Sequence, residues 1–592
     1  MTARLNDRRP LHERLSSWVA AGVLTEADTH IAAACAQLSG ESDDDVLLAI
    51  ALAIRAPRSG HVALDLARVR DQVHEALELI DESTADLAAT LAWPADVAKW
   101  LDAVANSPVA NTPNSPLVVD AGLVYLRRFH RHEVRVAEQL VQRASGAAKI
   151  DARLDLIASM MQLNPGQTGA LTVCLSGQLG VLTGGPGTGK TRTVAALLTA
   201  LLDASGAPLR AALVAPTGKA AARMGESIAE SAALLASSSD ETFVRAANDI
   251  MKMSPTTVHR LLGIRADRSG ATYDSRRPLP YDVVIVDEAS MLSLPLMDML
   301  LDALAPTSRL ILVGDAGQLA SVDAGSVLGD IARAEGVVAT RVAELVENRR
   351  FTEGGRLAAF ADAIRCGDHA AAVQVLSDNG TKNDGEASLN RVDTASAIAD
   401  VIAAHATAVV ESARVGAVDP ALKLLGELRV LCAHRHGPNG ASTWNHRVEQ
   451  HIGQAGYMSY GMYPGRPVMV TRNDRTQGLF NGDVGVIVRT DGEMRVAFSS
   501  NGEQRLVAAA QIESLETVHA MTIHKSQGSE FDHVIVVLPS ADSRLATREL
   551  LYTAVTRARR SVTIVGGADV ISAAIKRTER RTSALSHRLS SR

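Results

Sequence analysis

The stretch Gly184-Gly-Pro-Gly-Thr-Gly-Lys190-Thr191 follows the apolar run Gly180–Thr183 and precedes a segment with helical spacing. It is a G-x-x-x-x-G-K-[ST] pattern set between a strand and a helix. Glycines let such a loop curl, so that backbone N–H groups and the helix N-terminus point at phosphate oxygens. An ordinary glycine-rich turn is the alternative, and the strand and helix on either side argue against it.

This loop predicts a site for ATP and Mg²⁺. Lys190 would neutralise the β- and γ-phosphates, and the hydroxyl of Thr191 would hold the Mg²⁺. The rest of the loop would cradle the phosphates and consists of Gly184, Gly185, Pro186, Gly187, Thr188 and Gly189.

Two acidic residues follow another apolar run about a hundred residues further on. Asp287 and Glu288 come directly after Val283–Val286, and a carboxylate at the carboxyl end of a parallel strand lies beside the phosphate loop. We expect Asp287 to bind Mg²⁺ through water and Glu288 to orient or deprotonate the attacking water. The alternative is a pair of acids that caps the next helix.

Three further polar residues are candidates for the same site. Gln318 follows the apolar run Leu310–Val313 and could sense the γ-phosphate without adding a charge. Gln167 lies upstream of the loop and could read an edge of the adenine. Arg557 could stabilise transition-state charge from a second domain, as arginine fingers do. A surface arginine in a weak ion pair is the alternative for Arg557.

Composition places limits on the rest of the molecule. The 592 residues are too many for one core, and 46% hydrophobic with 21% charged residues is typical of a soluble globular protein. A net charge of −6 predicts that any DNA track is a local basic groove. The basic run around Lys576 and Arg581 is expected to be a solvated helix face or a frayed tail.

The cysteines and the apolar segments indicate the compartment. Four scattered cysteines without a C-x-x-C pair predict buried, reduced thiols and argue against zinc or an iron–sulfur cluster. The N-terminus lacks the apolar core of a signal peptide, and no run of eighteen apolar residues occurs. We therefore expect a cytoplasmic protein without a membrane segment.

The pattern along the chain changes near residue 150. Before it, Leu15–Ala34, Val46–Ala56 and Val73–Leu91 have helical spacing, and Asn106–Pro116 reads as a linker or loop. After it, continuous apolar runs alternate with helical segments, which predicts parallel sheets covered on both faces. The runs suffice for two α/β domains that divide near residue 345. Besides those quoted above, the expected strands are Ala211–Ala215, Leu428–Cys432, Val534–Leu538 and Val562–Val565.

Three segments interrupt this alternation. Ile264–Pro280 reads as a small hairpin with a Ser-Gly turn. Residues 455–515 contain short β-like runs separated by glycine turns, which predicts a small inserted β-barrel. Ser377–Arg391 is polar and is expected to be a surface loop.

Ordered motifs over about residues 155–567 resemble superfamily 1 helicases and, in detail, the RecD family, the alpha subunit of exodeoxyribonuclease V. Ser59–Leu66 resembles that family's N-terminal domain more weakly. Besides the phosphate loop, the motifs that carry the resemblance are Ala215-Pro-Thr-Gly-Lys219-Ala-Ala-Ala-Arg-Met224, Thr257-Val-His-Arg-Leu-Leu-Gly263, Val286-Asp-Glu-Ala-Ser-Met291, Gly314-Asp-Ala-Gly-Gln-Leu319, Asn348-Arg-Arg-Phe351, Cys432-Ala-His-Arg-His-Gly-Pro438 and Thr522-Ile-His-Lys-Ser-Gln-Gly-Ser-Glu530.

The resemblance implies an α/β fold with two tandem RecA-like P-loop domains, an N-terminal helical domain and a small inserted SH3-like β-barrel. The expected limits are 1–110 for the partner-docking helices, 150–345 for the first motor domain with its hairpin at 264–280, and 346–592 for the second with its barrel at 455–515. The hairpin would be the strand-separating element.

The resemblance also implies an ATP-dependent 5′ to 3′ helicase that unwinds duplex DNA ends. Its partners would be single-stranded and duplex DNA, a beta helicase–nuclease subunit and a gamma scaffold subunit. By motif position, Arg350 would contact the γ-phosphate and Arg557 would be the finger. The residues expected near the DNA backbone are Thr217, His259, Thr522 and His524.

Some features depart from the family pattern and leave alternatives open. The usual two prolines after Gln318-Leu are Ala320 and Ser321, and the usual tyrosine before the motif arginine is Arg349, so the choice between Arg349 and Arg350 is open. A free-standing RecD-like helicase is one alternative. Another is a P-loop ATPase switch that binds DNA without unwinding it. No nuclease centre is evident.

Overall fold

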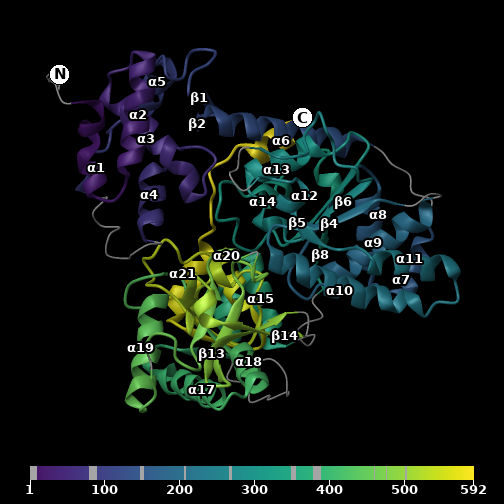
Figure 1. The fold of residues 1–592 in the computed structure, drawn as a ribbon. Helices are drawn as coiled ribbons and strands as arrows, with labels where there is room; N and C mark the ends of the chain where they lie inside the picture. The colour runs from purple at the N-terminus through teal and green to yellow at the C-terminus, as the bar shows by residue number, and fades with distance from the viewer. Residues whose placement is uncertain are drawn as a thin grey trace.

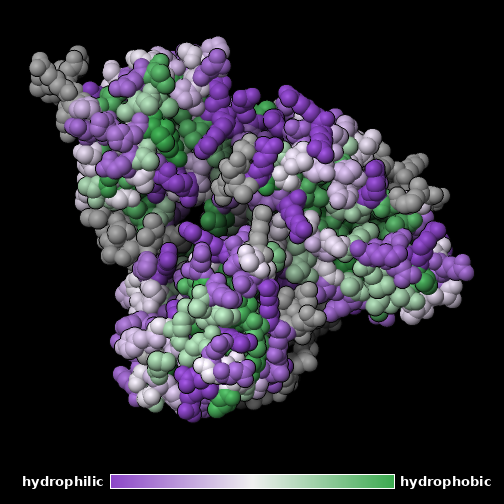
Figure 2. Space-filling model, in the orientation of Figure 1, coloured by the Kyte–Doolittle hydropathy of each residue, from purple (hydrophilic) through white to green (hydrophobic). Residues whose placement is uncertain are grey.

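The structure is a computed structural model, and it describes residues 10–78, 90–146, 152–205, 209–265, 270–347, 355–377, 388–458, 460–474, 476–500 and 503–591. Figure 1 shows an N-terminal helical unit, a first α/β domain beside it, and a second α/β domain below both. Figure 2 shows that this face is hollowed where the three parts meet.

The N-terminal unit is built around one buried helix, α3 (Asp44–Arg55), whose residues from Val46 to Ala53 are all buried. Asp43 caps this helix, because its carboxylate accepts hydrogen bonds from the backbone of Asp45 and Val46. The other elements are η1 (Leu11–Leu15), α1 (Ser16–Ala20), α2 (Glu26–Ser39), η2 (Ala56–Ser59), α4 (Val69–Glu78), α5 (Val97–Asn106), β1 (Leu117–Asp120) and β2 (Leu123–Leu126).

One prediction for this unit was wrong, and another, which left a linker or a loop open, is confirmed as a loop. The helical pattern over Leu15–Ala34 is broken after Ala20, because Gly22 has a positive φ of 71° and Thr25 caps a new helix. The stretch Asn106–Pro116 is a packed loop, since the hairpin that follows it adds Leu117 and Val124 to the N-terminal core.

The first α/β domain contains a six-stranded parallel sheet in the order β5-β4-β6-β7-β3-β8. Apolar residues alternate between its faces: Val284 and Leu310 pack with α6, α13 and α14, while Val283 and Ile311 pack with α8, α9 and α10. The prediction of a sheet covered on both faces is thereby confirmed.

Its strands are β3 (Leu179–Gly184), β4 (Ala211–Ala215), β5 (Thr256–Thr257), β6 (Val283–Val286), β7 (Arg309–Gly314) and β8 (Val342–Leu345). Its helices are α6 (Arg127–Ser145), α7 (Leu154–Met160), α8 (Pro165–Leu175), α9 (Lys190–Ala204), α10 (Gly218–Ala236), α11 (Glu241–Met251), α12 (Val258–Leu261), η4 (Ala289–Met291), α13 (Leu294–Ala303), α14 (Val327–Ala332) and η5 (Ala339–Arg341).

The hairpin predicted at Ile264–Pro280 is only partly within the described residues. There, Asp274 and Arg277 form a single antiparallel bridge, and Tyr273 packs against the core of the first domain. A strand-separating function for this segment stays a prediction.

The second α/β domain contains a five-stranded parallel sheet in the order β16-β10-β17-β18-β9. Its strands are β9 (Ser388–Val392), β10 (Leu428–Cys432), β16 (Ala520–Thr522), β17 (Phe531–Val537) and β18 (Ala558–Val565). Its helices are α15 (Arg356–Cys366), α16 (His369–Ser377), α17 (Ser396–Arg414), α18 (Val418–Glu427), α19 (Ala441–Gln454), η7 (His524–Ser526), α20 (Arg548–Val555) and α21 (Ala568–Lys576).

Two further expectations change here. Ser388–Arg391 belongs to the edge strand β9 and not to a surface loop, because it pairs in register with Ser561–Ile564 of β18. Residues 378–387 lie outside the described part. Among the cysteines, Cys174 and Cys432 are buried, Cys35 is half-buried, and Cys366 is exposed, so burial was wrong for Cys366.

One described helix, α17, is long and apolar enough to cross a membrane. It packs on α18, α19 and β12, with Ile402, Ala406 and Val410 buried. One face of α17 is thus buried in the second domain, and Val401 on another face is exposed.

The insertion at residues 467–517 is a five-stranded antiparallel sheet in the order β14-β13-β12-β11-β15, with its own apolar core. Hydrogen bonds join neighbouring strands in that order, and closure into an SH3-like barrel stays a prediction. Its elements are β11 (Pro467–Val470), β12 (Val484–Thr490), β13 (Glu493–Ser500), β14 (Glu503–Ala508), η6 (Ala509–Gln511) and β15 (Leu515–Thr517).

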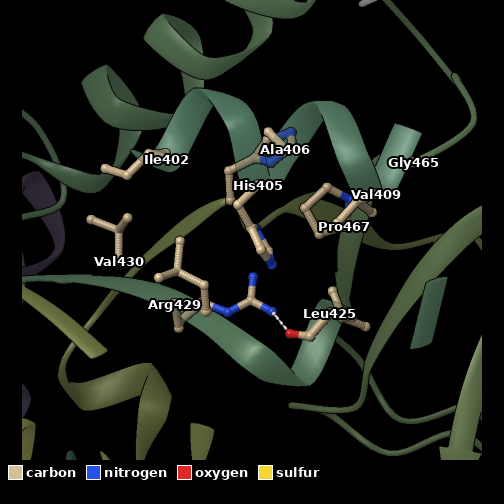
Figure 3. A pocket seen from close by; sticks show the side chains of 11 residues that line it. Ile402, His405, Ala406, Val409, Leu425, Arg429, Val430, Gly465 and Pro467 are labelled. Carbon is tan, nitrogen blue, oxygen red and sulfur yellow. Dashed lines mark hydrogen bonds between the residues drawn. The ribbon is translucent and has the colours of Figure 1, made fainter. Parts of the chain in front are cut away.

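A buried arginine holds this insertion to the second sheet. Arg429, only 2% exposed, faces a cavity of about 20 Å³ beside His405 (Figure 3). Its guanidinium donates to the carbonyls of Leu425 and Val518, which tie α18 to the end of the insertion. Burial lowers the pKa of Arg429 to about 10. The cavity is far too small for a nucleotide.

The last residues of the chain, 577–591, form a C-terminal strap that runs from the second α/β domain to the first (Figure 1). The Thr582 carbonyl accepts a hydrogen bond from Val62 of the N-terminal unit. The strap ends in α22 (Leu585–Ser590), which packs on α6 and buries Leu585 and Leu589 in the first domain's core. It therefore joins all three parts.

The expectation of a solvated face or frayed tail was wrong for much of the basic run. The side chain of Arg577 donates to the Ser543 carbonyl, and that of Arg581 donates to Glu579 at 2.6 Å. Lys576 and Arg580 are exposed.

We expect Arg588→Met to loosen the strap by about 3 kcal/mol, because it leaves a buried carboxylate without its cation. Arg588 Nε lies 2.8 Å from Glu133 Oε1, and Glu133 is 0% exposed. Hydrogen–deuterium exchange should show lost protection in α22 and adjoining α6. Arg580→Met, at an exposed position of the strap, is the matched control. Unchanged protection of α22 and α6 in Arg588→Met would show that the ion pair between Arg588 and Glu133 does not hold the strap in place.

Candidate nucleotide-binding cleft

A cleft of about 490 Å³ lies between the two α/β domains, at the carboxyl ends of the central strands of the first sheet. The first domain contributes Pro186, Gly187, Gly189, Lys190, Thr191, Arg192, Arg223, Ser227, Glu230, Ser231, Leu234, Asp287, Glu288, Asp315 and Gln318. The second contributes Gly528, Glu530 and Arg557.

The phosphate loop connects β3 to α9 and has a fixed shape. Gly187 and Gly189 have φ of 82° and 80°, which favours glycine at both positions. Lys190 begins α9, and its Nζ donates to the carbonyls of Gly184 at 2.7 Å and Gly185 at 2.9 Å. The ammonium group is thus held at the mouth of the loop.

The side-chain amide of Gln167 holds the phosphate loop in place. Its Nε2 donates to the Thr188 carbonyl at 3.0 Å, and its Oε1 accepts from the backbone of Asn164 at 3.0 Å. A Cβ at Gly189 would lie 2.2 Å from Gln167 Nε2. Gln167 is 1% exposed, so the structure gives it a loop-supporting contact, and its contact with adenine stays a prediction.

The two acids lie where the end of β6 meets the loop. Asp287 Oδ1 accepts from the backbone N–H of Glu288 at 2.8 Å. Burial, together with the charge of Glu288, raises the pKa of Asp287 to about 6, while Lys190 opposes this shift. Glu288 has a φ of 51°, a strained conformation for a residue with a side chain, and such strain clusters at functional sites.

The loop after β7 ties the cleft to the second domain. Gln318 Nε2 donates to Asp315 Oδ2 at 2.9 Å. The next residue, Leu319, donates its N–H to Thr553 Oγ1 at 2.9 Å and accepts from Gln527 Nε2 at 2.9 Å. Movement of either domain therefore reaches Gln318 through two hydrogen bonds.

Arg557 extends from the start of β18 toward the cleft and is 4% exposed. Its Nε donates to the Thr553 carbonyl at 3.1 Å, and its Nη1 donates to the Ser529 carbonyl at 3.3 Å. These two segments fix the guanidinium at the face of the second domain.

The other predicted arginine cannot be placed. Arg350 and its neighbour Arg349 lie outside the described residues, so the choice between them remains open. The nearest described strand before them, β8, ends at Leu345 beside β3.

The four predicted DNA contacts lie at strand ends on the two sheets. Thr217 caps α10 after β4, and His259 is exposed on α12 after the neighbouring strand β5. Thr522 ends the edge strand β16 and lines a groove of about 260 Å³. Burial lowers the pKa of His524, with Glu579 and Arg581 of the strap close by. Their contact with DNA stays a prediction.

Sequence reasoning missed several residues of the cleft. Arg192, Arg223 and Glu530 line it. Tyr552 lies against the loop, because a Cβ at Gly185 would be 2.6 Å from its hydroxyl. Burial and the charge of Asp315 raise the pKa of Tyr552 well above its usual value. Glu530 belongs to the motif that begins at Thr522 and Arg223 to the motif that begins at Ala215, whereas Tyr552 lies outside the motifs quoted above.

The donor set fits a magnesium–nucleotide. Thr191 offers a hydroxyl and Asp287 a carboxylate, and Mg²⁺ in nucleotide sites takes few protein oxygens besides phosphate and water. In the described part of the chain, no group of three or more His, Cys, Asp or Glu residues could hold a metal ion.

Three family matches cover much of the chain. Residues 20–125 match the N-terminal domain of RecBCD enzyme subunit RecD, and residues 162–386 match the AAA domain. Residues 517–565 match the UvrD-like helicase C-terminal domain.

The relatives agree with these matches. RecBCD enzyme subunit RecD of Mycolicibacterium smegmatis is 42% identical over 96% of this chain and 98% of its own. The same subunit of Haemophilus influenzae is 30% identical over 80% of this chain and 81% of its own. The ATP-dependent RecD2 DNA helicase of Deinococcus radiodurans is 31% identical over 78% of this chain and 58% of its own.

Solved structures show a more distant likeness. Pif1 helicase from Bacteroides in complex with ADP-AlF3 and ssDNA is 18% identical over 68% of this chain and 92% of its own, with a TM-score of 0.36. Pif1 helicase from Candida albicans is 18% identical over 71% of this chain and 96% of its own, with a TM-score of 0.37. The near full-length relatives decide the matter: the chain belongs to the RecD family of DNA helicase subunits.

Proposed function

We propose that this chain is the 5′ to 3′ motor of a RecBCD-type complex, working on DNA ends in the cytoplasm beside a helicase–nuclease subunit and a scaffold subunit. The observation that supports the motor most is the cleft itself, which combines a phosphate loop and two acids from one domain with Arg557 from the other. Closure of two such domains on ATP, and opening after hydrolysis, would move DNA in steps.

Each residue of the cleft then has a distinct task. Lys190 binds the β- and γ-phosphates, and Thr191 and Asp287 would hold Mg²⁺, which would neutralise phosphate charge. Glu288 orients and deprotonates the attacking water. Gln318 reports the γ-phosphate to the second domain through Leu319, and Arg557 stabilises charge in the transition state.

Partner docking falls to the N-terminal helices. On α2, Ile31 and Leu38 are 50% and 90% exposed and lie seven residues apart, about two turns, on one face. The same residues belong to the segment that matches the RecD N-terminal domain. The Mycolicibacterium smegmatis RecD subunit is 42% identical and matched over 98% of its length, whereas RecD2 is 31% identical and matched over 58% of its length, which favours a complex over a free-standing helicase.

The strained acid provides a direct test of the hydrolytic site. We expect Glu288→Gln to lower kcat of DNA-stimulated ATP hydrolysis by about 100-fold, because it removes a general base, while leaving the affinity for ATP nearly intact. The measurement is steady-state ATPase activity of the complex with and without single-stranded DNA, in a background where any partner motor is inactivated. Glu226→Gln, on α10 in the same domain, is the control.

Two results would count against the proposal. Full activity in Glu288→Gln would place the base elsewhere. ATP hydrolysis that single-stranded DNA does not change would favour a P-loop switch that binds DNA without moving along it.

A further inference from the structure

A lysine outside the cleft crosses the domain boundary and contacts the segment that holds Arg557. Lys219 lies in the first turn of α10 in the first motor domain, and its Nζ donates to Ser529 Oγ of the second at 2.7 Å. The two residues are 310 positions apart in the chain. This bond directly links the two motor domains.

Ser529 is well placed to transmit that contact. It is 5% exposed and lies between Gly528 and Glu530, which both line the cleft. Its side chain binds Lys219, while its carbonyl accepts from Arg557 Nη1 at 3.3 Å. The backbone N–H of the next but one residue, Phe531, donates to the Arg557 carbonyl at 2.9 Å. A shift of residues 529–531 therefore moves Arg557.

The other end of this route lies where DNA is expected. Thr217, two residues before Lys219, caps α10 and is a predicted DNA contact. Gly218 meets the inserted sheet, since a Cβ there would lie 2.7 Å from the ring of Phe480. The start of α10 thus lies between the DNA contact predicted at Thr217 and the second domain.

The surroundings of Lys219 lower the pKa of its ammonium group. Burial and the positive charge of Arg223 lower the pKa of Lys219 to about 8, with Asp483 of the inserted sheet opposing and Arg429 adding to the shift. A partly buried ammonium gives up much of its hydration, so its bond to Ser529 is worth more than an exposed one.

We propose that Lys219 is a positioning residue, which couples DNA at the start of α10 to the placement of Arg557 through Ser529. When DNA binds at the start of α10, Lys219 would pull on Ser529, and the Ser529 carbonyl would then move the Arg557 guanidinium into the cleft. The proposal rests on the function proposed above for Arg557.

The test compares Lys219→Met, Ser529→Ala and the double variant in the complex, with any partner motor inactivated. We expect each single variant to lower kcat of ATP hydrolysis at saturating single-stranded DNA about tenfold, the worth of one hydrogen bond to a charged group. KM for ATP and hydrolysis without DNA should change less than about twofold, since the bond acts only on coupling. The double variant should match the singles, and Lys219→Arg should regain most of the activity.

Each other result overturns the proposal in a recognisable way. Multiplied effects in the double variant would show that the two residues act separately. Recovery at higher DNA concentration would make Lys219 a DNA contact only, and a raised KM would make it an ATP contact. Lys252→Met, exposed in the same domain, controls for loss of a charge, and thermal melting identifies misfolding. If Arg557→Ala leaves kcat unchanged, Arg557 does not act in catalysis and the proposed function of this residue fails. If Arg557→Ala lowers kcat but Lys219→Met does not, only the coupling through Lys219 is overturned.

Discussion

Arg557→Ala is expected to lower kcat of DNA-stimulated ATP hydrolysis by about 10³-fold, the lower end of what arginine fingers contribute. The guanidinium lines the cleft from the second motor domain and is held by the carbonyls of Thr553 and Ser529. Because it acts on charge that develops in the transition state, KM for ATP should change little. Steady-state hydrolysis, together with fluorescent nucleotide titration, measures both quantities.

The matched control is Arg560→Ala, three residues further along the chain, at an exposed position of β18. It should hydrolyse ATP like the parent. An Arg557→Ala protein with unchanged kcat, or with weakened nucleotide binding alone, would show that this arginine is structural.

Lys190→Gln is expected to lower kcat/KM for ATP by at least about 10³-fold, because the amide is polar but uncharged and so removes the positive charge that faces the phosphates. Unlike Arg557→Ala, it should also weaken ATP binding, since the ammonium stands at the mouth of the phosphate loop in the structure. Isothermal titration with a non-hydrolysable ATP analogue separates the two variants.

Lys252→Gln, an exposed lysine of the same domain, is the comparison for Lys190→Gln. Its nucleotide affinity should equal that of the parent. Tight binding by Lys190→Gln with normal turnover would mean that the glycine loop is not where ATP is hydrolysed.

The parts of the fold that could be predicted are those encoded locally. Gly184–Thr191 and the acids after Val283–Val286 each sit directly after an apolar strand, and the strand's register alone places them at one edge of the sheet. The structure accordingly brings Lys190, Asp287 and Glu288 to a single cleft.

What escaped prediction depends on contacts between distant parts of the chain. Tyr552 contacts Gly185, and Lys219 contacts Ser529, only because the two domains pack together. The hydrophobic periodicity of the sequence predicts helices and strands but not how two domains pack. The C-terminal strap escaped for a related reason. A basic run resembles a solvated face unless its partner is known, and the partner of Arg588, Glu133, precedes it by 455 residues.

Ala320 departs from the family pattern and has a backbone N–H that the usual residue lacks. Its position usually holds proline, which has no N–H to donate. Here Glu579 of the strap has a lowered pKa despite its burial, because Arg581 lies beside it and the backbone N–H of Ala320 adds to the shift. The strap thus reaches the loop that follows Gln318.

The most direct test of the account is ATP-dependent unwinding of duplexes that carry either a 5′ or a 3′ single-stranded tail. The complex would be purified with its partner motor inactivated, beside the same complex carrying Lys190→Gln. Unwinding from the 5′ tail alone, lost in Lys190→Gln, is the predicted result. Hydrolysis of ATP without unwinding from either tail would contradict a motor, and unwinding from the 3′ tail would contradict its direction.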